Sequence, residues 1–197
     1  MRETPARIPP IFRHALGAPS CRGPHPRHQQ ERAHPLSGRL LVAAKYGAAF
    51  APLNLEFVNR GVSGNTVLEL QKRWATETLE LKPDVLSILI GVNDQSRNVP
   101  LDRYEQIYEE LLTQVEAANP KLRLVLCEPF TLAVGRKKDD WKAWRAGVQT
   151  RQDAVARLAA KHGAALVKFQ HVFNEACKVA PAEHWIWDGV HPTYFPS

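Results

Sequence analysis

The segment 187–193, with the sequence WDGVHPT, holds residue types that could carry out acid–base chemistry. Asp188 and His191 lie three positions apart on a turn that contains glycine, so the carboxylate can accept the imidazole Nδ1–H and leave Nε2 free as a general base. Pro192 disfavours a helical conformation for His191, which suits a residue that is presented from a loop. An ordinary surface turn uses the same residue types, so residues upstream must decide between a turn and a catalytic pair.

Two candidate hydrogen-bond donors follow predicted strands upstream of this turn. Gly61 lies in the glycine-rich turn RGVSGN after the segment 55–59, and Asn93 lies in the sequence GVND after the apolar run 84–90. The backbone N–H of Gly61 and the side-chain amide of Asn93 could both stabilise the oxyanion of an acyl-transfer reaction. Each also has a structural explanation, as a turn glycine and as a helix cap, but their placement after successive strands favours the catalytic interpretation.

The elements that must position these residues are predicted from apolar periodicity. Thr66 and Glu69 form a capping box at the start of one helix, and Gly163 ends another. The uninterrupted apolar runs 84–90 and 122–127 are typical of strands that are covered on both faces. Helices are expected over 40–48, 66–81, 101–118, 141–162 and 172–177, and strands over 55–59, 84–90, 122–127 and 165–169.

Strand and helix alternate four times in this pattern. Such alternation predicts an α/β fold with a mainly parallel sheet and right-handed crossovers. Because ligands in this architecture bind at the carboxyl ends of the strands, we expect the three candidate loops to converge on one edge of the sheet.

The positive charge of the chain is concentrated in a segment that does not read as folded structure. Of the net charge of +6, residues 1–36 contribute +4 from six Arg and two Glu, so the remainder is nearly neutral. This segment also holds seven of the fifteen prolines, a composition that cannot bury enough apolar surface to offset its ordering entropy. We expect a disordered tail over 1–37 and one folded domain over 38–197. Nucleic-acid binding is not expected, because the tail lacks interleaved aromatics and a known motif.

Cysteine usage and hydropathy bear on cofactors and location. Cys21, Cys127 and Cys177 are widely spaced and form no C-x-x-C pair, so neither a metal cluster nor a disulfide framework is predicted, and reduced thiols indicate the cytoplasm. No apolar run reaches the ~18 residues of a membrane span, and the N-terminus lacks the apolar region of a secretory signal. We therefore expect a cytoplasmic protein without a metal, an organic cofactor or a membrane partner.

Taken together, these segments resemble the SGNH hydrolases, also called the GDSL esterase and lipase family. Three blocks carry the resemblance, in the family's order: NRG with SGNT at 59–66, GVND at 91–94 and DGVHP at 188–192. The resemblance implies a three-layer α/β/α sandwich with a mainly parallel sheet, and ester hydrolysis through an acyl-enzyme.

The same resemblance implies roles for single residues. His191 would be the base, Asp188 the residue that orients it, and Gly61 with Asn93 the oxyanion hole. The residue patterns of the segments 61–67, 73–94 and 187–193 most resemble those of bacterial carbohydrate acetylesterases that deacetylate xylan-type sugars. This similarity implies a small-molecule or carbohydrate acetyl ester as the substrate.

The sequence departs from the family at both ends. The Gly-Asp-Ser block, which carries the nucleophile after the first strand, is absent, and relatives continue beyond the His block into a final helix. Ser20 lies at about the right distance before the first predicted helix but lacks the Asp and the apolar strand, so an ordinary tail serine explains it better. Ser37 and Ser63 are explained by helix-cap and turn roles. The predicted fold is therefore an SGNH sandwich that lacks its first strand and last helix.

Two functional hypotheses stay open. One is an active serine-type esterase whose nucleophile the sequence does not identify. The other is an inactive protein. It would be either a carbohydrate binder, in which Trp185 and Trp187 stack on a sugar, or the product of a gene that is frameshifted upstream and truncated downstream.

Overall fold

The computed structural model describes residues 58–135 and 139–193. The chain divides into two compact units, and all described residues belong to the unit Glu56–Thr193. The predicted tail and its boundary near residue 37, the helix 40–48, and the serines at 20 and 37 lie outside the described residues. So does most of the predicted strand 55–59, of which Val58 and Asn59 are described and lie in no strand.

The described strands form a three-stranded parallel sheet in the order β1-β2-β3. They are β1 (Val85–Leu89), β2 (Arg123–Cys127) and β3 (Ala165–Val167). Leu89 of β1 lies opposite Cys127 of β2, so these two strands end side by side. The parallel pairing confirms the predicted α/β class, although β3 ends earlier than expected because a helix begins at Phe169.

Helix α2 (Val67–Trp74) begins at the predicted capping box. Glu69 Oε2 accepts the backbone N–H of Thr66 at 2.8 Å, and Thr66 Oγ1 accepts the N–H of Leu68 at 3.2 Å. The helix continues as one π-helical turn, η3 (Ala75–Leu79), so the two together fill the predicted range. Because Asn65 and Gly64 come directly before this cap, the start of α2 also fixes the end of the glycine turn.

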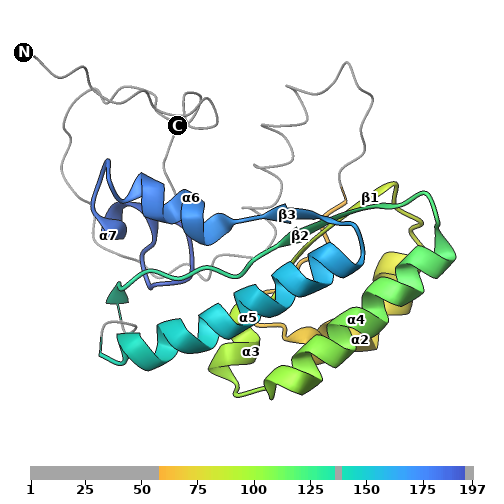
Figure 1. The fold of residues 1–197 in the computed structure, drawn as a ribbon, viewed down its shortest axis with the longest axis horizontal. Coiled ribbons are helices and arrows are strands. Elements are labelled where there is room, and N and C mark those ends of the chain that lie inside the picture. Colours follow the sequence, from red (N-terminus) through yellow and green to blue (C-terminus); the bar gives the residue numbers. More distant parts are fainter. Residues whose placement is uncertain (1–57, 136–138, 194–197) are drawn as a thin grey trace, which may run out of the picture. The chain divides into compact units, whose positions relative to one another are not determined.

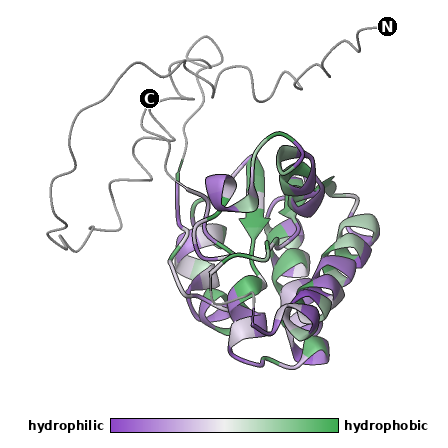
Figure 2. Ribbon diagram, turned by 90° about the vertical axis from the view of Figure 1, so that its left-hand side faces the viewer, coloured by the Kyte–Doolittle hydropathy of each residue, from purple (hydrophilic) through white to green (hydrophobic). Residues whose placement is uncertain are grey.

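The two long helices, α4 (Leu101–Ala118) and α5 (Trp141–Lys161), supply the crossovers between the strands. The buried residues of α4 are Tyr104, Ile107, Tyr108, Leu111, Leu112 and Val115. In α5, Val148, Val155 and Leu158 are buried, while Trp144 is half-buried. Figure 2 shows the sheet coloured hydrophobic, and the helices hydrophobic and hydrophilic in alternating patches. The 3.6-residue apolar period therefore matches the face that each helix buries.

The main core lies on one face of the sheet, where α2, α4 and α5 gather (Figure 1). Ile88, Leu124 and Leu126 point into it and are buried. On the opposite face, Val85 is 52% exposed and Leu89 is 50% exposed. The prediction that β1 is covered on both faces is therefore wrong for the described part of the chain. The physical reason is that the described helices packed on β1 all lie on one side, and β1 is at the edge of the described sheet.

A second, smaller core joins the segment after β2 to the last helices, α6 (Phe169–Ala176) and α7 (Ala182–Trp185). Phe130 stacks on Phe173 with ring centroids 4.5 Å apart, and Ile186 is fully buried beside them. Neither α7 nor α3 (Val92–Ser96) was predicted, because both helices are too short to show an apolar period. Within the described ranges, no helix is long and apolar enough to cross a membrane.

Candidate active site

Asp188 and His191 form a hydrogen-bonded pair at the surface of the protein. His191 Nδ1 lies 2.7 Å from Asp188 Oδ2, while Asp188 Oδ1 accepts the backbone N–H groups of Val190 at 3.1 Å and His191 at 2.8 Å. An ionised carboxylate only accepts, so Nδ1 carries the proton and Nε2 of the neutral ring is left as the basic nitrogen. The side chain of His191 is 59% exposed and that of Asp188 is 27% exposed, so the ring can meet a substrate.

The charge state of Asp188 follows from the same contacts. Partial burial raises the pKa of its carboxyl, but the hydrogen bonds from His191 and from two backbone N–H groups lower the pKa by more. The net pKa of Asp188 is below its ordinary value, because each of these donors favours the charged form. Asp188 therefore acts as a carboxylate that orients the His191 ring.

Gly189 gives the turn between the two residues its shape. Its φ of 98° is a conformation that side chains disfavour, and its carbonyl accepts Thr131 Oγ1–H at 2.8 Å and the Leu132 N–H at 3.0 Å. The turn is closed by an antiparallel bridge between Ile186 and Pro192. It is therefore a tightly held loop docked on the segment that follows β2, which is what the presentation of a base requires.

The two tryptophans beside the pair differ in their surroundings. Trp187 is 64% exposed and stacks on the His191 ring, with centroids 5.8 Å apart and an interplanar angle of 21°. Trp185 packs on the second core, and its Nε1 donates to the carbonyl of Ala180 at 3.2 Å. Trp187 is thus the tryptophan whose ring is available beside the pair.

Asn93 lies on α3, directly beyond the end of β1. Its Nδ2 donates to the carbonyl of Asn65 at 3.0 Å, which uses one of the two amide protons and leaves the other. Gly91 precedes it with φ 129°, and a Cβ there would lie 3.1 Å from Tyr104 Oη and 3.2 Å from Pro129 Cγ. Only glycine therefore allows the loop to leave the strand this close to the end of β2.

Gly61 is exposed, but its backbone N–H is already engaged. It donates to Asn59 Oδ1 at 2.9 Å. An oxyanion at Gly61 would have to replace this side-chain acceptor. The turn itself is held to the Asn93 loop, because Asp94 Oδ1 accepts the N–H of Val67 at 2.9 Å alongside the Asn93–Asn65 bond.

The predicted site residues therefore lie in two groups, each of which is held together by its own hydrogen bonds. Asp188 contacts His191 directly, and the loops of Gly61 and Asn93 are tied to each other. Both groups lie beyond the carboxyl ends of β1 and β2, which run side by side. Within 58–135 and 139–193 no hydrogen bond joins the two groups, and none of the described serines, Ser63, Ser87 and Ser96, is hydrogen-bonded to His191.

The burial of two ionisable residues next to the Asn93 loop was not predicted. Asp94 is fully buried and Arg151 is 5% exposed. Arg151 donates to the carbonyls of Val99 at 2.6 Å and Gly147 at 3.1 Å, and it also bonds Gln95. Burial raises the pKa of Asp94, although its backbone hydrogen bonds and the nearby Arg151 oppose the rise. In the sequence Arg151 looks like a solvated helix position, and Asp94 is marked only as the last residue of the GVND block, with no role of its own.

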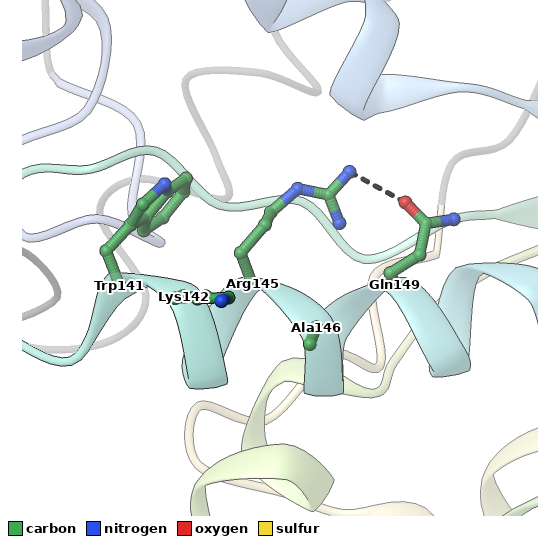
Figure 3. A pocket seen from close by; sticks show the side chains of 5 residues that line it. All are labelled: Trp141, Lys142, Arg145, Ala146 and Gln149. Carbon is green, nitrogen blue, oxygen red and sulfur yellow. Dashed lines mark hydrogen bonds between the residues drawn. The ribbon is translucent and has the colours of Figure 1, made fainter.

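Other features of the described residues offer little chemistry. No group of three or more His, Cys, Asp and Glu residues within these ranges could hold a metal ion. Burial raises the pKa of both described thiols, Cys127 and Cys177. A hollow of about 470 Å³ on α5 is lined by Trp141, Lys142, Arg145, Ala146 and Gln149 (Figure 3), where Arg145 donates to Gln149 at 2.8 Å. It contains no acid–base pair, so the candidate reaction centre is the Asp188–His191 turn.

Comparison with known proteins finds similar sequences and structures among esterases and GDSL-like lipases. An acetylxylan esterase from Geobacillus stearothermophilus is 31% identical over 157 residues, which cover 74% of this chain and 68% of that enzyme. Its crystal structure matches with a TM-score of 0.67, over 78% of this chain and 72% of that one. A structure from Parabacteroides merdae, assigned to the GDSL-like lipases, matches with a TM-score of 0.72 at 38% identity, over 78% and 73% of the two chains.

Solved catalytic mutants of the acetylxylan esterase replace a serine, an aspartate and a histidine. The aspartate and histidine lie three positions apart in that enzyme, as Asp188 and His191 do here. The sequence model of the GDSL-like lipase/acylhydrolase family matches residues 25–194, most of the chain. With its parallel α/β sheet and these relatives, the chain belongs to the GDSL-like lipase/acylhydrolase family, the SGNH hydrolases.

Proposed function

We propose that this protein is a serine-type hydrolase of acetyl esters, with an acetylated carbohydrate as its substrate. The observation that carries the proposal is the 2.7 Å contact between Asp188 Oδ2 and His191 Nδ1 in an exposed turn. A base held in one tautomer, with its other nitrogen open to a substrate, is the central requirement of nucleophilic acyl transfer.

In the proposed reaction, His191 Nε2 removes the proton of a serine hydroxyl while the serine oxygen attacks the ester carbonyl carbon. The carbonyl electron pair moves to the oxygen, which Asn93 and, after release of Asn59, the N–H of Gly61 stabilise. His191 then passes the proton to the departing alcohol and leaves an acetyl-serine. Water repeats the sequence and releases acetate. Asp188 stabilises the imidazolium that forms in each half.

The nucleophile is the open part of the proposal. Ser20 stays a candidate and lies outside the described residues. Labelling with a fluorophosphonate serine probe, followed by peptide mass spectrometry, tests it. We expect one serine to be labelled in the wild type and in the control His171→Gln, which changes an exposed histidine on α6. The same serine should stay unlabelled in His191→Gln.

A folded wild-type sample that takes up no label would contradict the esterase proposal. The alternative is then a binding protein that keeps the pocket without the chemistry. The exposed ring of Trp187 favours this alternative as a stacking surface for sugars. Calorimetric binding of acetylated xylo-oligosaccharides without release of acetate would establish it, and Trp187→Ala should abolish that binding.

The acetyl and carbohydrate parts of the substrate are supported by the relatives of 30–31% identity that are named acetylxylan esterases. They are tested by comparing acetate release from acetylated xylo-oligosaccharides with hydrolysis of longer-chain nitrophenyl esters. The proposed chemistry uses protein side chains alone, so dialysis against EDTA should leave the rate unchanged.

The cytoplasmic location and the domain boundary at residue 38 are also part of the proposal. The odd number and wide spacing of the cysteines support a reducing compartment. Cell fractionation tests the location, and limited proteolysis tests the boundary, with the first cuts expected before residue 38.

A further inference from the structure

The carbonyl of Gly189, in the middle of the candidate catalytic turn, is held by two donors from a distant segment. Thr131 Oγ1 lies 2.8 Å away and the Leu132 N lies 3.0 Å away. Thr131 is fully buried, and Gly189 is buried as well. Both lone pairs of the carbonyl are therefore occupied by groups that solvent does not reach.

The direction of the Thr131 hydroxyl proton is fixed by its other neighbour. The indole Nε1 of Trp144 lies 2.8 Å from Thr131 Oγ1. An indole N–H can only donate, so the hydroxyl oxygen accepts from Trp144. Its single proton then points to Gly189, and a hydroxyl that accepts and donates in one chain is polarised in that direction.

The backbone of Thr131 is fixed just as firmly. Its N–H donates to Gln170 Oε1 at 3.0 Å, and its carbonyl accepts Gln170 Nε2–H at 2.9 Å. Gln170 is itself 6% exposed and its backbone N–H donates to Glu128 Oε1 at 3.0 Å. Thr131 is thus anchored to α6 through Gln170 and to α5 through Trp144, and it cannot follow the turn if the turn moves.

The held carbonyl belongs to the same peptide unit as a group that orients the catalytic carboxylate. The Gly189 carbonyl and the Val190 N–H lie on opposite sides of one planar peptide. That N–H donates to Asp188 Oδ1 at 3.1 Å. Fixing the carbonyl therefore fixes the direction of the N–H, which in turn directs Asp188 Oδ2 toward His191.

From this geometry we infer that Thr131 is a positioning residue for the Asp188–His191 pair. It touches neither member of the pair and acts through the Gly189 peptide. Its consequence for catalysis rests on the proposed esterase function. Its effect on the turn does not, and it can be measured without a substrate.

The test is hydrogen exchange of the backbone amides of Val190 and His191, followed by NMR in the full chain. In Thr131→Val, which keeps the shape and removes the hydroxyl, we expect both amides to exchange about five- to tenfold faster, as loss of one buried hydrogen bond predicts. The amides of Leu111 and Leu112 in α4, which report global unfolding, should be accelerated by no more than the same factor, because the lost bond also lowers the stability of the whole fold.

Two controls separate this effect from a general loss of stability. Thr131→Ser retains the hydroxyl and should exchange within about twofold of the wild type. Thr150→Val removes an exposed hydroxyl of α5 that bonds the carbonyl of Gly147, and it should also leave the turn unchanged. Wild-type exchange at Val190 and His191 in Thr131→Val would overturn the inference, as would an equal acceleration of these two amides in Thr150→Val.

If Thr131→Val does not fold, Trp144→Phe takes its place. It retains the hydroxyl but frees its direction, so Val190 should still exchange faster, and wild-type exchange would overturn the inference. On an acetyl ester, Thr131→Val should lower kcat and leave KM unchanged. A wild type without activity would contradict the proposed function, while the exchange rates would still decide the role of Thr131.

Discussion

The buried carboxylate of Asp94 accepts the backbone N–H of Val67 across 2.9 Å. This bond joins the loop that carries Asn93 to the start of α2. The turn that carries Gly61 ends at the same point. Because Asp94 is fully buried, desolvation raises its pKa in spite of this hydrogen bond and of Arg151 nearby. The link between the two proposed oxyanion donors is therefore made by a group that folding holds in an unfavourable environment for charge.

Asp94 should make stability fall as pH rises. A raised pKa means that the folded protein holds this proton more tightly than the unfolded chain, so the contribution is full below the ordinary value of 3.8 and is lost as pH rises through the raised value. Asp94→Asn retains the acceptor for Val67 and removes the titration. In urea unfolding from acid to neutral pH, the wild type should lose stability relative to Asp94→Asn. Parallel curves would show that Asp94 does not titrate differently in the folded state.

Asp188 should have the opposite effect. Its pKa is lowered in the folded protein, so its contribution is present above the ordinary value of 3.8 and is lost as pH falls through the lowered value. The stability difference between the wild type and Asp188→Asn should therefore be largest near neutral pH and disappear in acid. A difference that persists unchanged in acid would mean that the asparagine acts through packing.

Asp188→Asn should also lower the turnover of an acetyl ester by about three to four orders of magnitude, because the amide no longer holds His191 in the productive tautomer. Initial rates on 4-nitrophenyl acetate measure the loss. Asp153→Asn is the matched control, since this exposed residue accepts a hydrogen bond from Gln149 at 2.7 Å and an asparagine can still accept it. Activity of Asp188→Asn at the control's level would rule out the pair as the acid–base centre.

Asn93→Ala should lower kcat about 10²- to 10³-fold if its free amide proton stabilises the oxyanion. Asn119→Ala is a matched control, because Asn119 Nδ2 donates to the carbonyl of Pro83 at 2.9 Å, as Asn93 does to Asn65 at 3.0 Å. Both variants lose a bond from a side-chain amide to a loop carbonyl, and Asn119→Ala also loses the acceptor of the Lys121 N–H at 3.1 Å. At about 0.5–1.5 kcal/mol for each bond, the control should lose at least as much stability as Asn93→Ala. Only Asn93→Ala should lose rate, and equal rates would reduce Asn93 to a structural role.

The long elements and the contact between Asp188 and His191 could be predicted because their signals are local. The period of α4 extends over many turns, and the three-residue spacing of Asp188 and His191 already brings their side chains into reach. The short helices α3 and α7 could not be predicted, since neither is long enough to repeat an apolar pattern.

The contacts that could not be predicted join residues that are far apart along the chain. Thr131 bonds Gly189 from 58 positions away, and nothing near either residue indicates the other. The bond from the Gly61 N–H to Asn59 Oδ1 is local instead, and it is the Asx turn that an asparagine two positions before a glycine favours. The exposed face of β1 was missed because an apolar strand has the same sequence whether one face or both are covered.

Gly91→Ala should destabilise the fold more than the same change at Gly163. Both glycines have positive φ, 129° and 61°, so both variants should lose about 1–2 kcal/mol through the backbone. Nothing lies within 4 Å of a Cβ at Gly163, whereas at Gly91 it would meet Tyr104 Oη at 3.1 Å and Pro129 Cγ at 3.2 Å. Gly91→Ala should therefore lose a further 1–3 kcal/mol, roughly, from overpacking. Urea unfolding of the two variants measures the difference, and equal losses would mean that the ends of β1 and β2 can separate to admit a methyl group.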